Sequence, residues 1–413
     1  MPPVTHAHAA AEAPPTLLDA LARAPAAAAL VVAALEQAED RKALRLTHPQ
    51  LRDAVGEATT KLGAGLPAAA RPPTSQRWPR LEELTVDRPD LATIEALGSA
   101  TWRALRSLRI NGLTGPDVSF NADKADLDAP AARALAAALR RMPALRALDL
   151  DCMVFSDAAA GELFRSSSAE AVPQLRALTV SNAELTLTAV CVLAAAGWRL
   201  EELDLSGNAL GAAGLAALLS APTFAFRRLA VFRCSLDAAA LLALANAPWP
   251  LEELDLTGNN FHDAAAAAAL PALSRHAGLR RLYVGDCLSA ASFKALVEAA
   301  WPALTHFGAC QAKVAFDALG AAAFAGFPAL EELDLSGVAL GEAGAALLAS
   351  RRWMRLKKMN LYVCRLGATG VAALARGAWP ALEWLNLFGN DIGAQLALED
   401  ARRWAPALVE LRQ

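Results

Sequence analysis

LEELDLSGNALGAAGLAALL, at residues 200–219, joins a short alternating segment to a stretch rich in alanine and leucine. In the first part, Leu203 and Leu205 alternate with acidic residues, which is the period-2 pattern of a half-buried strand. The second part begins at Gly211 and consists mainly of residues that favour the α-helix. This stretch therefore predicts a strand followed by a helix.

The same apolar-x-x-apolar-x-apolar pattern occurs thirteen times in the chain. Its first apolar positions are Leu81, Leu105, Leu145, Leu175, Leu200, Phe226, Leu251, Leu279, Leu304, Leu330, Leu356, Leu382 and Leu408. All steps but one are 24 to 30 residues long, the exception being the 40 residues after Leu105. A period of this length is typical of a solenoid, in which each repeat packs against its neighbours. We therefore expect one elongated domain of about 13 repeats over residues 78–413.

The predicted strands are too short to be stable alone, so they must pair with the strands of neighbouring repeats. The helix after each strand brings the chain back to the end of the sheet where that strand began. The next strand therefore runs in the same direction, and the pairing is parallel. We therefore expect an α/β arc in which the parallel strands line the concave face and the helices cover the convex face.

Charge and composition narrow the classes of partner. The chain has 39 Lys and Arg residues against 42 Asp and Glu, a net charge of −3, and no basic stripe, which argues against nucleic acid. No segment has the length and apolar character of a membrane span, and the N-terminus lacks a signal-peptide pattern. We expect no membrane partner and a cytoplasmic protein, with the nucleus as the alternative. No Cys/His cluster has metal-ligand spacing, so neither a metal nor a cofactor is expected.

Three cysteines have a place in the repeat. Cys234, Cys287 and Cys364 each lie three residues after the last apolar residue of their strand, where other repeats carry asparagine. Side chains at this point turn inward and bond to neighbouring backbone groups. We therefore interpret the three thiols as structural and reduced.

The residues two, four and six places after each first apolar position should face the concave surface, because side chains alternate along a strand. Over eight repeats the residue two places on alternates largely between acidic and basic. The column reads Glu202, Arg228, Glu253, Arg281, His306, Glu332, Lys358 and Trp384. Opposite charges on adjacent strands attract, so the column is interpreted mainly as a structural ladder.

Aromatic residues give the best indication of a binding site. Eight of the nine tryptophans lie two to four residues before a first apolar position and are assigned to the core; they are Trp78, Trp102, Trp198, Trp249, Trp301, Trp353, Trp379 and Trp404. Other aromatics fall on the predicted concave face, where such side chains are common in interfaces. The predicted partner-binding residues are Phe232, Tyr283, His306, Lys358, Tyr362, Trp384 and Phe388. Tyr362, Trp384 and Phe388 should form one patch, with Lys358 as a cation beside Trp384; the alternative is that these rings only stabilise adjacent repeats.

A catalytic site is not indicated. His306 and Cys310 project from one strand, but four residues of strand separate them by about 13 Å, too far for a hydrogen bond. No motif of hydrolases, metalloproteases or nucleotide-binding proteins occurs in a convincing context. We therefore expect no enzymatic activity.

Residues 78–413 resemble leucine-rich repeats of the ribonuclease-inhibitor-like and cysteine-containing kinds, as in the stretch that begins at Leu200. The resemblance implies a scaffold that binds a protein on its concave face.

The N-terminal region belongs to no repeat. Residues 1–14 are rich in alanine and proline and are expected to be disordered, residues 15–62 are helical in pattern, and residues 63–77 resemble a linker. ALVVAALEQAEDRKALRLTHPQLRDAV, at residues 29–55, resembles an F-box and departs from it at the start. The resemblance implies contacts with a Skp1-like adaptor through Pro25, Leu35, Leu44, Leu46 and Leu51.

Two functions remain open at this point. The chain could be the substrate-recognition subunit of a Skp1-cullin-F-box type ubiquitin ligase, or it could be a scaffold or inhibitor without an F-box. In the second case, residues 15–62 only cap the first repeat, as every solenoid requires at its ends.

Overall fold

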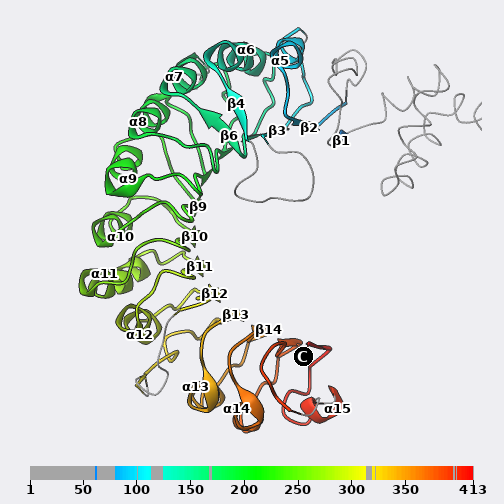
Figure 1. Cartoon of the computed structure of the whole chain (residues 1–413), viewed down its shortest axis with the longest axis vertical. Helices are drawn as coiled ribbons and strands as arrows, with labels where there is room; N and C mark the ends of the chain where they lie inside the picture. Colours follow the sequence, from blue (N-terminus) through cyan, green and yellow to red (C-terminus); the bar gives the residue numbers. More distant parts are fainter. Residues whose placement is uncertain are drawn as a thin grey trace, which may run out of the picture.

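The repeats stack side by side into an arc in the computed structural model, with strands along the inner side and helices along the outer side (Figure 1). The structure describes residues 61–62, 80–99, 101–112, 124–166, 170–312, 319–320, 322–393, 396 and 398–412. The expected solenoid architecture is confirmed. No helix in these ranges combines the length and the apolar character needed to cross a bilayer.

One parallel sheet runs through the described part of the arc, and its strands follow chain order. They are β1 (Lys61–Leu62), β2 (Glu83–Asp87), β3 (Ser107–Asn111), β5 (Ala147–Asp149), β7 (Ala177–Thr179), β8 (Glu202–Asp204), β9 (Arg228–Ala230), β10 (Glu253–Asp255), β11 (Arg281–Tyr283), β12 (His306–Gly308), β13 (Glu332–Asp334), β14 (Lys358–Asn360), β15 (Trp384–Asn386) and β16 (Glu410–Arg412). Each of the thirteen predicted repeats contributes one of the strands from β2 onward.

A second, two-stranded sheet pairs β4 (Ala125–Leu127) with β6 (Met153–Phe155). The described helices are α5 (Leu91–Leu97), α6 (Ala129–Leu139), α7 (Asp157–Ser166), α8 (Leu187–Ala195), α9 (Gly211–Leu219), α10 (Ala238–Ala245), α11 (Ala264–Ala269), the 3-10 helix η1 (Leu270–Arg275), α12 (Ala290–Glu298), α13 (Gly341–Ala349), α14 (Gly367–Leu374) and α15 (Leu398–Ala401). Several helices begin at a side-chain cap, as where the Asp237 carboxylate accepts a 3.0 Å hydrogen bond from the Ala240 N–H.

The sheet begins one strand earlier than the repeat pattern indicates. Lys61 and Leu62, at the end of the segment expected to be helical, form β1 and pair with Glu83 and Leu84 of β2. The helical expectation is therefore wrong for these two residues. The F-box-like residues Pro25, Leu35, Leu44, Leu46 and Leu51, the linker at residues 63–77 and Trp78 lie outside the described residues.

Among the described tryptophans before the strands, six are buried and Trp404 is half-buried, and four of the buried ones cap the helix that precedes them. Trp102, Trp301, Trp353 and Trp379 are each 4 % exposed or less. Each indole N–H donates to a backbone carbonyl five residues earlier, in the last turn of a helix, at 2.8 to 3.0 Å. The last carbonyls of a helix have no partner within it, so each ring both fills the core and satisfies one of these groups.

Buried asparagines join neighbouring repeats through their backbones. The Asn208 side chain accepts from the N–H groups of Ala183 and Leu185 at 3.1 and 3.0 Å and donates to the carbonyls of Val180 and Leu205 at 2.7 and 2.8 Å. Asn259 and Asn390 make the same four kinds of bond.

The three repeat cysteines occupy the equivalent position in other repeats. The Cys234 thiol donates to the Leu205 carbonyl of the preceding repeat at 3.2 Å, and Cys364 does the same to Leu335 at 3.1 Å. Burial raises the pKa of Cys234, Cys287 and Cys364 to about 12, so the thiols stay protonated at neutral pH. All three are free and buried, as the sequence predicted.

Two kinds of repeat alternate along much of the array. Repeats that begin at Leu200, Leu251 and Leu330 carry Glu two places on and Gly seven places on. Repeats that begin at Phe226, Leu279 and Leu356 carry a basic residue two places on and Cys eight places on. The alternation of charge and the recurrence of Cys in every second repeat therefore belong to one two-repeat pattern over these six repeats.

Candidate binding site on the concave face

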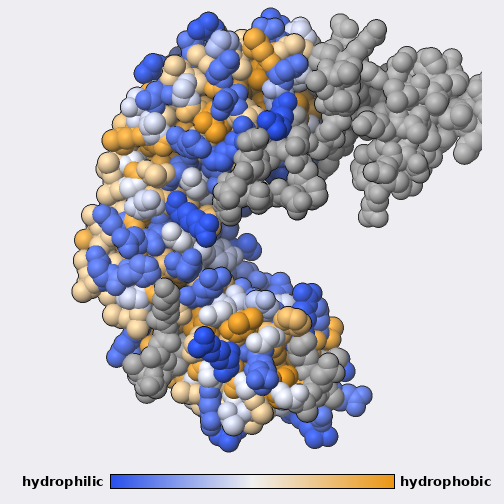
Figure 2. All heavy atoms as spheres, in the orientation of Figure 1, coloured by the Kyte–Doolittle hydropathy of each residue, from blue (hydrophilic) through white to orange (hydrophobic). Residues whose placement is uncertain are grey.

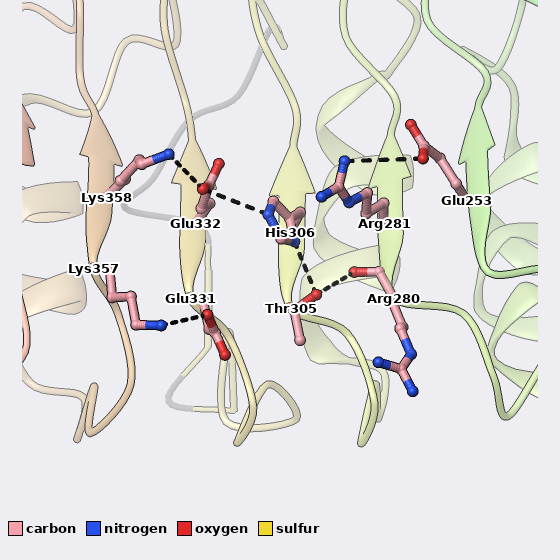
Figure 3. A network of polar contacts seen from close by, with 9 residues as sticks. All are labelled: Glu253, Arg280, Arg281, Thr305, His306, Glu331, Glu332, Lys357 and Lys358. Carbon is pink, nitrogen blue, oxygen red and sulfur yellow. Dashed lines mark hydrogen bonds and ion pairs between the residues drawn. The ribbon is translucent and has the colours of Figure 1, made fainter. Parts of the chain in front are cut away.

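The predicted charge ladder forms across the middle of the concave face (Figure 3). Arg281 lies 3.9 Å from Glu253, Lys358 lies 2.7 Å from Glu332, and Glu202 pairs with Arg228. The residues one place earlier pair in the same way, as where Lys357 lies 2.8 Å from Glu331. These groups are in contact with solvent, which screens each pair, so the ladder mainly balances charge between strands and adds little to stability.

The His306 side chain is less exposed than the Glu, Arg and Lys side chains of the ladder. Thr305 Oγ1 donates to the Arg280 carbonyl at 3.0 Å, so its oxygen is free to accept from His306 Nδ1–H at 2.8 Å, as Figure 3 shows. His306 Nε2 lies 3.5 Å from Glu332. Burial lowers the pKa of His306 below its ordinary value, and Glu332 only partly opposes that effect. The imidazole is therefore mostly neutral at pH 7.

A hollow of about 370 Å³ crosses the concave face from β11 to β15. Four of the predicted site residues line it: Tyr283, His306, Lys358 and Trp384. Glu332, Asp334 and Asn360, which the sequence did not single out, complete its polar lining. The hollow lies on the strand side of the arc, and hydrophilic and hydrophobic side chains are mixed over the face seen in Figure 2.

Tyr283 separates this hollow from a second one of about 250 Å³, which lies over β7 to β10. The Tyr283 ring leans across the sheet onto the next strand, where a Cβ on Gly308 would lie only 2.8 Å from Tyr283 Cδ1. Glycine at this position therefore allows the tyrosine ring to lie against the sheet. In the second hollow, burial is the main cause that raises the pKa of Asp204 above its ordinary value.

The cation that lies over the Trp384 ring is Arg412, with its guanidinium carbon 5.5 Å from the ring centroid. Lys358 was expected in this place. It pairs with Trp384 in the sheet register, but its ammonium group is engaged by Glu332 of the preceding strand. The ion-pair ladder explains the difference, because a carboxylate holds the lysine more strongly than an exposed ring does.

Tyr362 and Phe388 form a stacked pair just beyond the ends of β14 and β15. Their ring centroids are 5.9 Å apart and their planes differ by 8°. The two side chains are 44 % and 55 % exposed, and the neighbouring Val363 is 41 % exposed. Val363 has φ of 52°, unusual for a β-branched residue, and a Cβ on Gly389 would lie 2.8 Å from its Cγ2. The three side chains Tyr362, Val363 and Phe388 are called the aromatic edge below.

Phe232 lies apart from the other predicted site residues, after β9. The guanidinium carbon of Arg233 lies over its ring, 5.0 Å from the ring centroid. The structure thus divides the predicted set into the hollow, the aromatic edge and an isolated Phe232.

The described residues contain no group of three or more side chains suited to hold a metal ion. Cys310 hydrogen-bonds to Ser336 and Asp334, and burial raises its pKa to about 11. His306 bonds to Thr305 and contacts Glu332, as described above. Each member of the apparent Cys/His pair therefore has other neighbours.

Comparison with known proteins agrees with this geometry. The Leucine Rich repeat family model matches residues 200–219 and 250–268; the first range contains β8 and α9, and the second contains β10 and nearly all of α11. The fold is a leucine-rich repeat solenoid. Pig (Sus scrofa) ribonuclease inhibitor is 29 % identical over 242 residues, which are 55 % of this chain and 50 % of the inhibitor. The leucine-rich repeat chain thus spans about half the length of that relative.

Solved structures overlap with this chain at low identity. The Rad7 and Elc1 complex from yeast gives a TM-score of 0.47 at 13 % identity, covering 94 % of this chain and 87 % of the other. An internalin from Listeria monocytogenes gives 0.42 at 16 % identity, covering 90 % and 97 %. Overlap at this level gives no indication of a shared partner.

Proposed function

We propose that this leucine-rich repeat chain binds a protein partner on its concave face and has no catalytic role of its own. The observation that supports the proposal best is the aromatic edge, where a stacked Tyr–Phe pair stays about half exposed beside the hollow. Exposed aromatics side by side are uncommon on a surface that stays in water and common at the centre of interfaces. Free, buried thiols favour a reducing compartment, and we infer the cytoplasm or the nucleus.

Replacing both Tyr362 and Phe388 by alanine is expected to weaken partner binding at least tenfold. Interface aromatics commonly contribute 2 kcal/mol or more when they are truncated. The fold should survive, because both rings lie on the surface. The partner is first identified by affinity purification and mass spectrometry, and its dissociation constant is then measured with purified components by calorimetry.

The matched control is Leu242→Ala, which removes an equally exposed apolar side chain, 49 % exposed, from α10. It should leave the dissociation constant unchanged. If the double variant binds as well as wild type, or if both variants weaken binding alike, the aromatic edge is not the contact surface.

We further propose that the partner is presented to a ubiquitin ligase, with the F-box-like residues Pro25, Leu35, Leu44, Leu46 and Leu51 on a Skp1-like adaptor. This proposal is supported only by the N-terminal resemblance. A pull-down with purified Skp1 should recover the full chain and should fail for a chain that lacks residues 1–60, which keeps β1 and all the repeats. If the full chain fails to bind Skp1, the alternative holds, and the N-terminal segment belongs to a scaffold or inhibitor without an adaptor.

A further inference from the structure

The hollow between Tyr283 and Trp384 has a volume of about 370 Å³. That volume is near the lower end of the range for small-ligand sites, and it suits one large side chain or a short segment rather than a folded element. The aromatic edge lies at its C-terminal end, where Tyr362 follows β14 and Phe388 follows β15. A partner bound at the aromatic edge would therefore place neighbouring residues over the hollow.

The polar lining of the hollow does not balance its own charge. Glu332 is neutralised by Lys358, whose ammonium group lies 2.7 Å from it. In the described part of the chain, Asp334 accepts hydrogen bonds only from neutral donors: the Ser336 N–H at 2.9 Å, Asn360 Nδ2 at 3.0 Å and the Cys310 thiol. Among the described residues no ion pair involves Asp334.

His306 does not supply the missing positive charge. Burial lowers its pKa, and Arg281 and Lys358 act in the same direction. Glu331 and Glu332 oppose them without reversing the shift. The lining therefore carries two carboxylates, Glu332 and Asp334, against the single ammonium group of Lys358, which leaves one negative charge in the hollow at neutral pH.

We propose that the hollow receives an arginine side chain of the protein partner, with its guanidinium on Asp334 and its flat face against Tyr283. The inference rests on the proposed function, because it takes the concave face as the partner-binding surface. A guanidinium is planar and stacks on aromatic faces while it donates to a carboxylate. An anionic group would be repelled by Asp334, and a purely apolar side chain would remove water from that carboxylate without replacing its hydrogen bonds.

The test uses N-acetyl-L-arginine amide as the probe and N-acetyl-L-citrulline amide as its uncharged counterpart of the same shape. Because Trp384 lines the hollow, its indole N–H resonance in a nitrogen-15 spectrum reports occupancy, and Trp384→Phe assigns that resonance. The arginine amide should shift the signal with a dissociation constant on the order of 1 mM, as a single contact group allows. The citrulline amide should bind at least fivefold more weakly.

Asp334→Asn should weaken arginine amide binding at least fivefold and leave citrulline amide binding unchanged. Asp204→Asn is the matched control, since Asp204 occupies the same register position in β8 and lies outside this hollow. It should change neither value by more than twofold. Equal binding of the two amides, equal effects of the two substitutions, or no shift with the arginine amide would each overturn the proposal.

No protein partner is present in this titration. A negative result here, together with lost partner binding in the Tyr362/Phe388 variant, would remove the arginine proposal and leave the proposed function intact. A positive result, together with unchanged partner binding in that variant, would show that the hollow binds the arginine group independently of the aromatic edge.

Discussion

Replacing Asn208 by alanine is expected to lower the free energy of unfolding by about 3–5 kcal/mol, since several buried polar groups lose their partners at once. The side chain is fully buried and bonds two N–H groups and two carbonyls that belong to two neighbouring repeats. A methyl group in its place leaves all four without these bonds. Urea denaturation followed by circular dichroism measures the loss.

Asn246→Ala is the matched control for this substitution. The Asn246 side chain donates to the Leu242 carbonyl at 2.8 Å and accepts from the Arg275 guanidinium at 2.8 Å, but it is exposed and water replaces both lost bonds. Its effect should stay below about 1 kcal/mol, because no buried polar group is left without a partner. Equal losses for Asn208 and Asn246 would contradict the role given to burial.

Trp301→Ala should also destabilise the fold by about 3–5 kcal/mol, the usual range when a large buried ring is removed from a core. The ring is 2 % exposed, packs near Phe327, and donates to the Leu296 carbonyl at 2.9 Å. Trp301→Phe keeps most of the apolar contact and removes the donor, so its loss should be about 1–3 kcal/mol, the cost of an unsatisfied buried group. The midpoint and slope of urea unfolding give both values.

Trp384→Ala provides the comparison within the same residue type. Trp384 is only half-buried, and its ring faces the hollow and Arg412 rather than the core. Its removal should cost clearly less than the removal of Trp301. A similar loss in the free energy of unfolding would mean that Trp384 stabilises the repeats. That result would support the alternative hypothesis, in which the concave aromatic rings only stabilise adjacent repeats.

The repeat pattern predicted much of the fold because the position of a residue within its repeat determines whether its side chain faces the core or the surface. That is why Trp301 could be assigned to the core and Cys234 to the inward position before any geometry was known. The hydrogen bond from Trp301 to Leu296 could not be predicted, since it depends on how the last turn of α12 meets the next strand. The short strand β1 contains too few residues to carry the repeat pattern.

The candidate site was predictable only in part. Alternation along the strands correctly placed Tyr283 and Trp384 in the lining of one face, but the hollow also depends on Gly308, which lets the Tyr283 ring lean over the neighbouring strand. The ladder could have shown that Lys358 is not the cation over Trp384, because Glu332 is its stronger partner, but it could not have identified Arg412. Asp334 was not predicted, because its proposed role depends on contacts that the sequence does not show. Its carboxylate is bonded by neutral groups such as Ser336 N–H and Asn360 Nδ2, so its negative charge has no neighbouring cation among the described residues.

The two-repeat alternation constrains how a chain of this kind can change its length. Loss of residues 226–250, one repeat, would bring β8 beside β10 and set Glu202 against Glu253 and Glu201 against Glu252. Loss of residues 226–278, two repeats, would bring β8 beside β11 and set Glu202 against Arg281, so that attraction is kept. Over this part of the array, duplication and deletion are therefore tolerated best in steps of two, and the natural unit of growth is the pair rather than the single repeat.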